Sequence, residues 1–125
     1  GSGILAIAAK KLGADEVIGV DIDTQAVIAS RDNAANNQVE AVFYDSAEYL
    51  HEPFDIVVAN ILSSALMVLA PVIAKSCKSG GKVALSGILD SQQDMLLTHY
   101  SEWFEMDAPI QQDGWVLLTG TRKCL

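Results

Sequence analysis

The sequence predicts an α/β fold whose sheet is mostly parallel and ends in an antiparallel hairpin. Apolar runs of strand length alternate with patterns of helical period along the chain. The runs are apolar almost throughout, which is typical of parallel strands covered by helices on both faces. Near the end, the pair Asp113-Gly114 separates two apolar runs, and such a pair forms the tight turn of an antiparallel hairpin.

Four of these runs are the predicted parallel strands. They are rich in β-branched and aromatic residues, and turn-forming or charged residues bound them. They cover residues 16–23, 40–45, 54–62 and 81–89. A hairpin of two strands over residues 103–123 follows them. The order is therefore a helix, then strand–helix units, then a terminal hairpin.

Four helices are predicted between the strands, over residues 3–12, 24–36, 63–78 and 90–100. In the first helix, Ile4, Leu5, Ala8 and Leu12 share the face that we expect to be buried, and Gly13 can form the C-terminal cap.

The ends of the other helices also carry signals. Asp23 or Thr24 can cap the second helix. Pro71 predicts a kink or a restart in the third, because proline removes a backbone donor from a helix interior. Asp90, with Gln93 three residues later, resembles a capping box for the fourth.

Composition and charge narrow the class of protein. The chain has 125 residues, of which 50% are hydrophobic, which fits one folded domain. No apolar run is long enough to span a membrane, and no signal peptide is visible. Cys77 and Cys124 lack metal-type spacing and are expected to be reduced thiols in a cytoplasmic protein.

The net charge of −8 argues against binding to nucleic-acid backbones. The charge is uneven: residues 1–60 hold ten acids and three bases, whereas residues 61–125 hold six acids and five bases. An acidic first half would attract a cationic ligand or substrate. Ordinary solubility is the simpler explanation of the same charge.

Three strand ends carry polar groups suited to chemistry, because ligands of open α/β sheets lie beyond the carboxyl ends of the strands. The first is the turn Gly1-Ser2-Gly3, which leads into a helix and lets a ligand approach the backbone closely. The run G-S-G-I-L-A also satisfies a dinucleotide-binding pattern. Alternatively, the first two residues are the remnant of an expression tag.

Asp21 and Asn60 mark the other two strand ends. Asp21 lies 20 residues after Gly1, where an acid can bind both ribose hydroxyls of an adenosine cofactor. Asn60 ends an apolar strand, where an amide is costly unless something uses it; its carbonyl could accept a hydrogen bond from an amine. Asp45, at the end of another strand, is a weaker candidate for the adenine edge.

Other residues are interpreted as structural. Asp23 fits a helix cap better than a ligand, and Asn60 itself could instead form a turn before Ser63. Trp103 and Trp115 flank the hairpin and are expected to pack. No spacing of catalytic nucleophile and base is visible.

Two adenosine cofactors suit this pattern, NAD and S-adenosylmethionine, and the glycine-to-acid spacing does not separate them. An NAD-binding fold usually continues with further parallel units, whereas this chain closes with an antiparallel hairpin. Asn60 also stands where a methyl acceptor would lie. Both features favour methyl transfer.

The stretches "GSGILAIAAKKLGADEVIGVDIDTQAVIASRDNAANN", "DIVVANIL", "SGGKVALSGIL" and "GWVLLTGTRK" resemble the catalytic domain of the bacterial ribosomal protein L-eleven methyltransferase family. The resemblance covers nearly the whole chain and implies a Rossmann-like, class I S-adenosylmethionine-dependent methyltransferase fold. It implies that Gly1, Gly3, Asp21 and Asn60 bind the cofactor and that Asn60 also faces the acceptor.

The same resemblance implies missing parts. The family's glycine motif reads Asp-x-Gly-Cys-Gly-Ser-Gly, and only its last three residues match, at Gly1-Ser2-Gly3. The first strand, a linker and a small substrate-recognition domain would precede it. We therefore expect residues 1–125 to be a truncated catalytic domain, inactive or impaired alone, whose exposed sheet edges favour dimer formation.

The expected activity is methylation of lysine side chains and the N-terminal amine of a large-subunit ribosomal protein, in the cytoplasm, with neither metal, nucleic acid nor membrane as a partner. A methyltransferase acting on protein glutamine or RNA, and a non-catalytic adenosine-binding domain, stay as alternatives. A dehydrogenase fragment is a more distant one.

Overall fold

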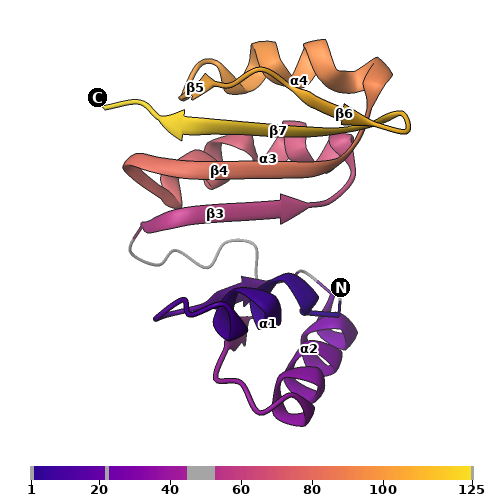
Figure 1. The fold of residues 1–125 in the computed structure, drawn as a ribbon, viewed down its shortest axis with the longest axis vertical. Coiled ribbons are helices and arrows are strands. Elements are labelled where there is room, and N and C mark those ends of the chain that lie inside the picture. The colour runs from indigo at the N-terminus through magenta and orange to yellow at the C-terminus, as the bar shows by residue number, and fades with distance from the viewer. Residues whose placement is uncertain (1, 22, 45–52, 125) are drawn as a thin grey trace. The chain divides into compact units, whose positions relative to one another are not determined.

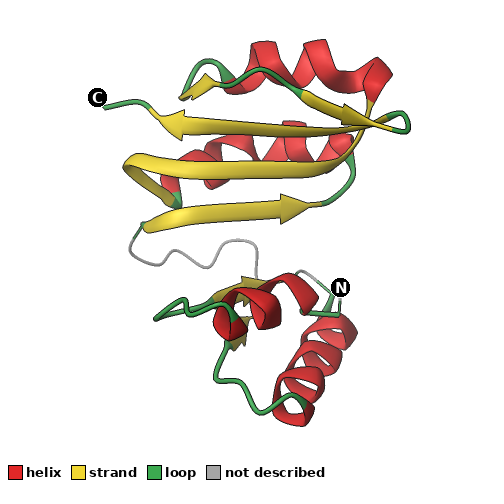
Figure 2. Ribbon diagram, viewed as in Figure 1, coloured by secondary structure: helices red, strands yellow, loops and turns green. Residues whose placement is uncertain are grey.

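The computed structural model describes residues 2–21, 23–44 and 53–124, and the chain divides into two compact units, residues 1–49 and 50–125 (Figures 1 and 2). The first unit holds α1 (Ile4–Lys11), β1 (Ile18–Val20), α2 (Thr24–Asn36) and β2 (Val42–Tyr44). The second holds β3 (Phe54–Asn60), α3 (Ser63–Lys75), β4 (Cys77–Leu89), a 3₁₀ turn (Asp90–Gln92), α4 (Gln93–Tyr100), β5 (Phe104–Met106), β6 (Ile110–Gln112) and β7 (Trp115–Arg122).

The first unit is a βαβ arrangement with a small core. β1 and β2 pair in parallel, and α2 connects them. The core consists of residues from both helices and from β2: Ile7, Val27, Ala34 and Phe43. The ring of Phe43 covers Gly19, where an added Cβ would lie only 2.5 Å from a ring carbon, so glycine is required there for packing.

The ends of α1 and α2 follow the sequence prediction. Gly13 (φ 103°) follows α1, where its N–H and that of Ala14 donate to Lys10 O and Ala9 O at 3.2 and 3.1 Å. These two bonds form a Schellman cap. Asp23 caps α2, since its side chain accepts a hydrogen bond from Gln25 N at 3.0 Å.

The predicted buried face of α1 is wrong. Ile4 and Leu12 are 69% and 88% exposed, whereas Ile7 is buried. Gly3, Ala6 and Lys10 are partly buried on the same side as Ile7, at helical spacing. Because almost every residue of the run ILAIAA is apolar, the hydrophobic pattern indicates a helix without defining which face packs.

The second unit is a mixed sheet in the order β3-β4-β7-β5, with β6 also paired to β7. β3 and β4 are parallel, and β5 and β6 both run antiparallel to β7. The predicted α/β class is confirmed, with its parallel strands and antiparallel ending. The hairpin differs in detail: two short strands, β5 and β6, pair with β7 where one strand was expected. Pro109, which has no N–H, lies in the break between them.

One face of this sheet carries the core. α3 and α4 supply Leu66, Ala70, Leu96 and Tyr100, which pack against Val83, Leu85, Ile88, Val116 and Leu118 of the central strands. The hydroxyl of Tyr100 donates to Leu66 O at 2.6 Å and ties the two helices together. Burial raises the pKa of Tyr100 above its ordinary value, so the phenol stays a donor.

The predicted restart at Pro71 is wrong, because α3 runs through it from Ser63 to Lys75 as one helix. Pro71 cannot donate to Met67 O, four residues earlier. The side chain of His99 in α4 occupies that position, with Nε2 3.1 Å from Met67 O. Since a carbonyl only accepts, Nε2 carries the hydrogen. A tertiary contact therefore satisfies the backbone group that Pro71 leaves open.

The predicted capping box is one residue out of place. Asp90–Gln92 form a 3₁₀ turn before α4, and Gln92 Oε1 accepts from Leu89 N at 3.0 Å. Within the described part of the chain, no helix is long and apolar enough to cross a membrane.

Candidate active site at the carboxyl ends of β3 and β4

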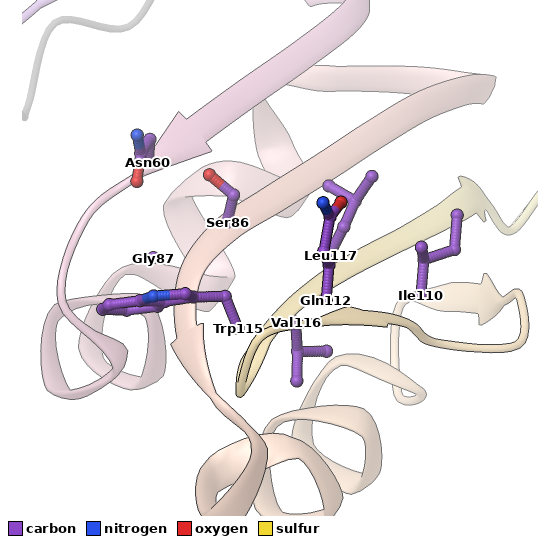
Figure 3. A pocket seen from close by; sticks show the side chains of 8 residues that line it. All are labelled: Asn60, Ser86, Gly87, Ile110, Gln112, Trp115, Val116 and Leu117. Atoms are coloured by element: carbon purple, nitrogen blue, oxygen red, sulfur yellow. The ribbon is translucent and has the colours of Figure 1, made fainter.

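A pocket of about 490 Å³ opens in the second unit where β3 and β4 end. Figure 3 shows its lining side chains, which come from β3, β4 and the C-terminal hairpin: Asn60, Ser86, Gly87, Ile110, Gln112, Trp115, Val116 and Leu117. Carboxyl ends of parallel strands are where α/β folds place their ligands, so this pocket is the candidate active site.

Strand register brings these residues together. Asn60 is paired with Ser86 across the parallel β3–β4 ladder. Trp115 is paired with Leu89 across the antiparallel β4–β7 ladder, which places the hairpin next to the same strand end. Ile110 and Trp115 are 59% and 55% exposed, so the hairpin gives the pocket an apolar wall that is open to a ligand.

Asn60 lies where the sequence analysis placed it, at the end of a strand, but its surroundings differ from the expectation. The residue is exposed, so its amide is not a buried group in need of a partner. It shares a face of β3 with Ile56 and Val58, which are 65% and 53% exposed. On that face Asn60 is accessible to a ligand.

Two oxygens converge next to Gly87 at the edge of this pocket. A Cβ built on Gly87 would lie 2.8 Å from Asn60 Oδ1 and 2.9 Å from Ile61 O. One is a side-chain carbonyl and the other a backbone carbonyl. Both oxygens are hydrogen-bond acceptors.

The basic residues of the second unit are gathered at one end, whereas acids lie at both ends, and Asp55 pairs with Lys78 Nζ at 3.4 Å away from the pocket. Asp90 and Asp113 lie at the pocket's end, where Asp90 N donates to Gly114 O at 3.0 Å in the hairpin turn. The lysines and arginines of residues 53–124 lie at the opposite end: Lys75, Lys78, Lys82, Arg122 and Lys123. There Lys82 Nζ donates to Thr121 Oγ1 at 2.6 Å, and Arg122 Nε to Ala74 O at 3.0 Å. The end of the second unit that holds the pocket therefore favours a cationic ligand.

The first unit holds the other predicted site residues. Gly3 precedes α1 with φ 78°, and its missing side chain leaves room for Ser30, which would lie 2.9 Å from an added Cβ. The Ser2 carbonyl next to it accepts from Asn33 Nδ2 at 3.0 Å, which ties the glycine turn to α2.

Asp21 follows β1 directly, as predicted. Its N–H donates to Tyr44 O at 3.0 Å, and its Oδ1 accepts from Asp23 N at 2.9 Å. These bonds hold the carboxylate at the carboxyl end of β1. Gly1 and Asp45, the two remaining predicted cofactor residues, lie outside the described residues.

The cysteines and the possible metal ligands of the described part are the remaining candidates for chemistry. No group of three or more His, Cys, Asp or Glu residues there could hold a metal ion. Cys77 and Cys124 are free thiols. Burial raises the pKa of Cys77, although Arg122 opposes that shift, and the thiol lies 3.6 Å from Lys82 O. We interpret Cys77 as a packing residue.

Sequence reasoning missed Gly87 and Trp115. The signal for Gly87 was present, because Ser86-Gly87 interrupts a predicted strand and a glycine there marks a bulge or a close approach. Trp115 was interpreted as a packing residue, and only the β4–β7 register shows that its ring reaches the pocket (Figure 3).

Known proteins resemble the chain over almost its whole length. The model of the family described as ribosomal protein L11 methyltransferase matches residues 1–123. A ribosomal protein L11 methyltransferase of Methylobacillus flagellatus is 62% identical over 123 residues, which cover 98% of this chain and 42% of that protein. The relative from Chromobacterium violaceum is 52% identical, with 98% and 41% covered. The chain thus spans less than half the length of these relatives.

Solved structures agree with the sequences. The crystal structure of a ribosomal protein L11 methylase from Lactobacillus delbrueckii subsp. bulgaricus matches with a TM-score of 0.93 and 34% identity, covering 99% of this chain and 67% of that one. An RNA methyltransferase from Salinibacter ruber shares only the fold, with a TM-score of 0.77 and 20% identity over 98% and 76% of the two chains. From the family match and these relatives, the chain belongs to the ribosomal protein L11 methyltransferase family.

Proposed function

We propose that this chain is the catalytic part of an S-adenosylmethionine-dependent N-methyltransferase that modifies lysine side chains and the N-terminal amine of ribosomal protein L11. The observation that carries the proposal is the convergence of Asn60 Oδ1 and Ile61 O beside Gly87; Asn60 and Gly87 line the pocket. The names of the relatives support the substrate.

The described residues of the first unit fit an adenosine cofactor. Asp21 stands at the carboxyl end of β1, where a carboxylate can accept hydrogen bonds from ribose hydroxyls. Gly3 directly precedes α1 and places the glycine turn at the start of that helix. We propose Gly1 and Asp45 as further contacts. When bound, the cofactor supplies an activated methyl group on a sulfonium.

The role of Asn60 is to orient the acceptor. A methyl transfer needs a neutral amine whose lone pair points along the line of attack. If Asn60 Oδ1 and Ile61 O each accept one amine hydrogen, the lone pair is left to point elsewhere, and rotation about the C–N bond is restricted. Two carbonyls therefore align the nucleophile without acting as a base.

The proton of an arriving lysine must leave before transfer. Asp90 and Asp113 attract the ammonium toward the pocket's end, but a nearby negative charge also favours the charged form. We propose that solvent takes the proton at the pocket mouth, where Asn60 is exposed.

The test combines binding and turnover. Calorimetry would use residues 1–125 and a version extended upstream, each with S-adenosylmethionine and with NAD. We expect S-adenosylmethionine to bind and NAD not to, and we expect Asp21→Ala to weaken binding more than the exposed-residue control Asp32→Ala. Binding of NAD without binding of S-adenosylmethionine would favour the alternative that the chain is part of a dehydrogenase.

Turnover separates the remaining alternatives. The upstream-extended protein should methylate ribosomal protein L11, and Asn60→Ala should lower kcat about 100-fold if it orients the amine. Cofactor binding without any methyl transfer would favour a non-catalytic adenosine-binding domain. Methylation of RNA or of protein glutamine would show that the enzyme acts on a different class of acceptor. Near-normal turnover by residues 1–125 would contradict our proposal that this stretch is impaired alone.

We also propose that residues 1–125 associate through an exposed sheet edge. Among the described strands, β3 pairs only with β4, and it exposes Ile56 and Val58. Unpaired edges with apolar side chains favour strand pairing between molecules. Sedimentation should show a dimer that Val58→Lys weakens; a monomer at all concentrations would contradict this.

A further inference from the structure

Gly87 has an unusual place in β4. The β4–β7 register shifts between Leu85 and Ile88, and Gly87 lies within this irregularity with φ 80°. A left-handed backbone of this kind disfavours any side chain. In addition, an added Cβ would lie 2.8 Å from Asn60 Oδ1 and 2.9 Å from Ile61 O, closer than real Cβ atoms approach other atoms.

We propose that Gly87 is a positioning residue that allows the two acceptor oxygens to converge. Its missing side chain leaves the space into which the Asn60 amide and the Ile61 carbonyl turn over the end of β4. Gly87 itself need not touch the substrate. The inference rests on the proposed function, in which these oxygens receive the amine, and adds the residue that sets their position.

A second glycine in the same strand separates crowding from backbone conformation. Gly80 has φ 79°, almost the value of Gly87, yet an added Cβ there would meet nothing within 4 Å. An alanine is therefore strained by its φ at both positions but displaces neighbours at Gly87 alone. Gly80→Ala is the matched control.

The kinetic test uses the upstream-extended protein. Gly87→Ala should lower kcat for L11 methylation about 100-fold, because a displacement of about 1 Å at a reacting group has an effect of that size. The Kd for S-adenosylmethionine should change less than about twofold. Gly80→Ala should leave both within about twofold. Equal loss of kcat in the two variants would overturn the proposal, since backbone strain would then explain it.

A double-mutant cycle tests the route through Asn60. If Gly87→Ala acts by moving the amide, it should lower the residual rate of Asn60→Ala by much less than 100-fold. An undiminished 100-fold loss in that background would overturn the proposal. If Gly87→Ala fails to fold while Gly80→Ala folds, Asn60→Ala should restore part of the folding by removing Oδ1, and no recovery would contradict crowding by the Asn60 amide.

One measurement does not depend on activity. The side-chain amide signals of Asn60 in a nitrogen–proton NMR spectrum should shift in Gly87→Ala and stay in place in Gly80→Ala. An unmoved Asn60 signal in Gly87→Ala would overturn the positioning role. If the parent protein transfers no methyl group but the signal shifts as expected, the proposed function fails while the packing relation stands.

Discussion

The two units of the chain differ in how much apolar surface they bury. In the second, α3, α4 and the central strands share one core in which Leu66, Leu85 and Leu118 are fully buried. In the first, only four described side chains form the core, and large apolar residues such as Leu12 and Val42 are exposed. Because burial of apolar area is the main stabilising term, the second unit should be the more stable of the two.

This difference bears on function. The proposed acceptor site lies on β3, on β4 and just after β3 in the better-packed unit, whereas Gly3 and Asp21 belong to the unit with the smaller core. Groups that align reacting atoms need rigid supports, and regions with few buried contacts open most readily. A cofactor that binds the first unit would also stabilise it by mass action.

The largest expected effect comes from the core of the second unit. Leu85→Ala should lower its free energy of unfolding by about 3 kcal/mol, because Leu85 is fully buried and its truncation leaves a cavity. Hydrogen exchange should show weaker protection in residues 53–124 and unchanged protection in α2. Ile4→Ala, at a site 69% exposed, is the control and should change stability little. Equal loss of protection in both units would mean that they unfold together.

A smaller effect should follow from the contact that compensates for Pro71. His99→Ala removes the partner of Met67 O and should cost about 1–2 kcal/mol of stability, measured by urea unfolding. Pro71→Ala restores a backbone donor to the same carbonyl, so His99→Ala should cost less in that background. The same cost in both backgrounds would show that His99 acts only through its ring contacts with Trp103 and Tyr100.

The smallest of the three effects concerns the first unit. Asp23→Ala should destabilise α2 by about 1 kcal/mol through loss of the cap on Gln25 N. Hydrogen exchange should report it at the start of α2 and leave the second unit unaffected. Asp32→Ala, inside the same helix and exposed, serves as the control for loss of one charge. If both variants are alike, the cap contributes no more than an ordinary surface acid.

Local signals predicted most of the elements correctly. Gly13 and Asp23 mark helix ends, and each acts over a few residues through its own backbone or side chain. Asn60 and Asp21 were identified as candidates because the end of a strand can be predicted from the point where an apolar run stops. The residues that pack against one another were harder to predict. The buried face of α1 was wrong because its run is apolar all round, and Trp115 was misread because its neighbour, Leu89, is distant in sequence.

By itself, the sequence determined the α/β class, the order of the strands and helices up to the hairpin, and the family, since periodicity, turn residues and motifs are properties of short stretches. It missed the start of β4, which lies at Cys77 inside the predicted third helix. The tertiary structure decided which distant residues those stretches contact. Pro71 lies inside a helix in which His99 reaches Met67 O, and the Asn60 amide lies against Gly87, where a side chain would not fit. Both outcomes depend on contacts between distant segments, which exist only once strand register and helix packing are set.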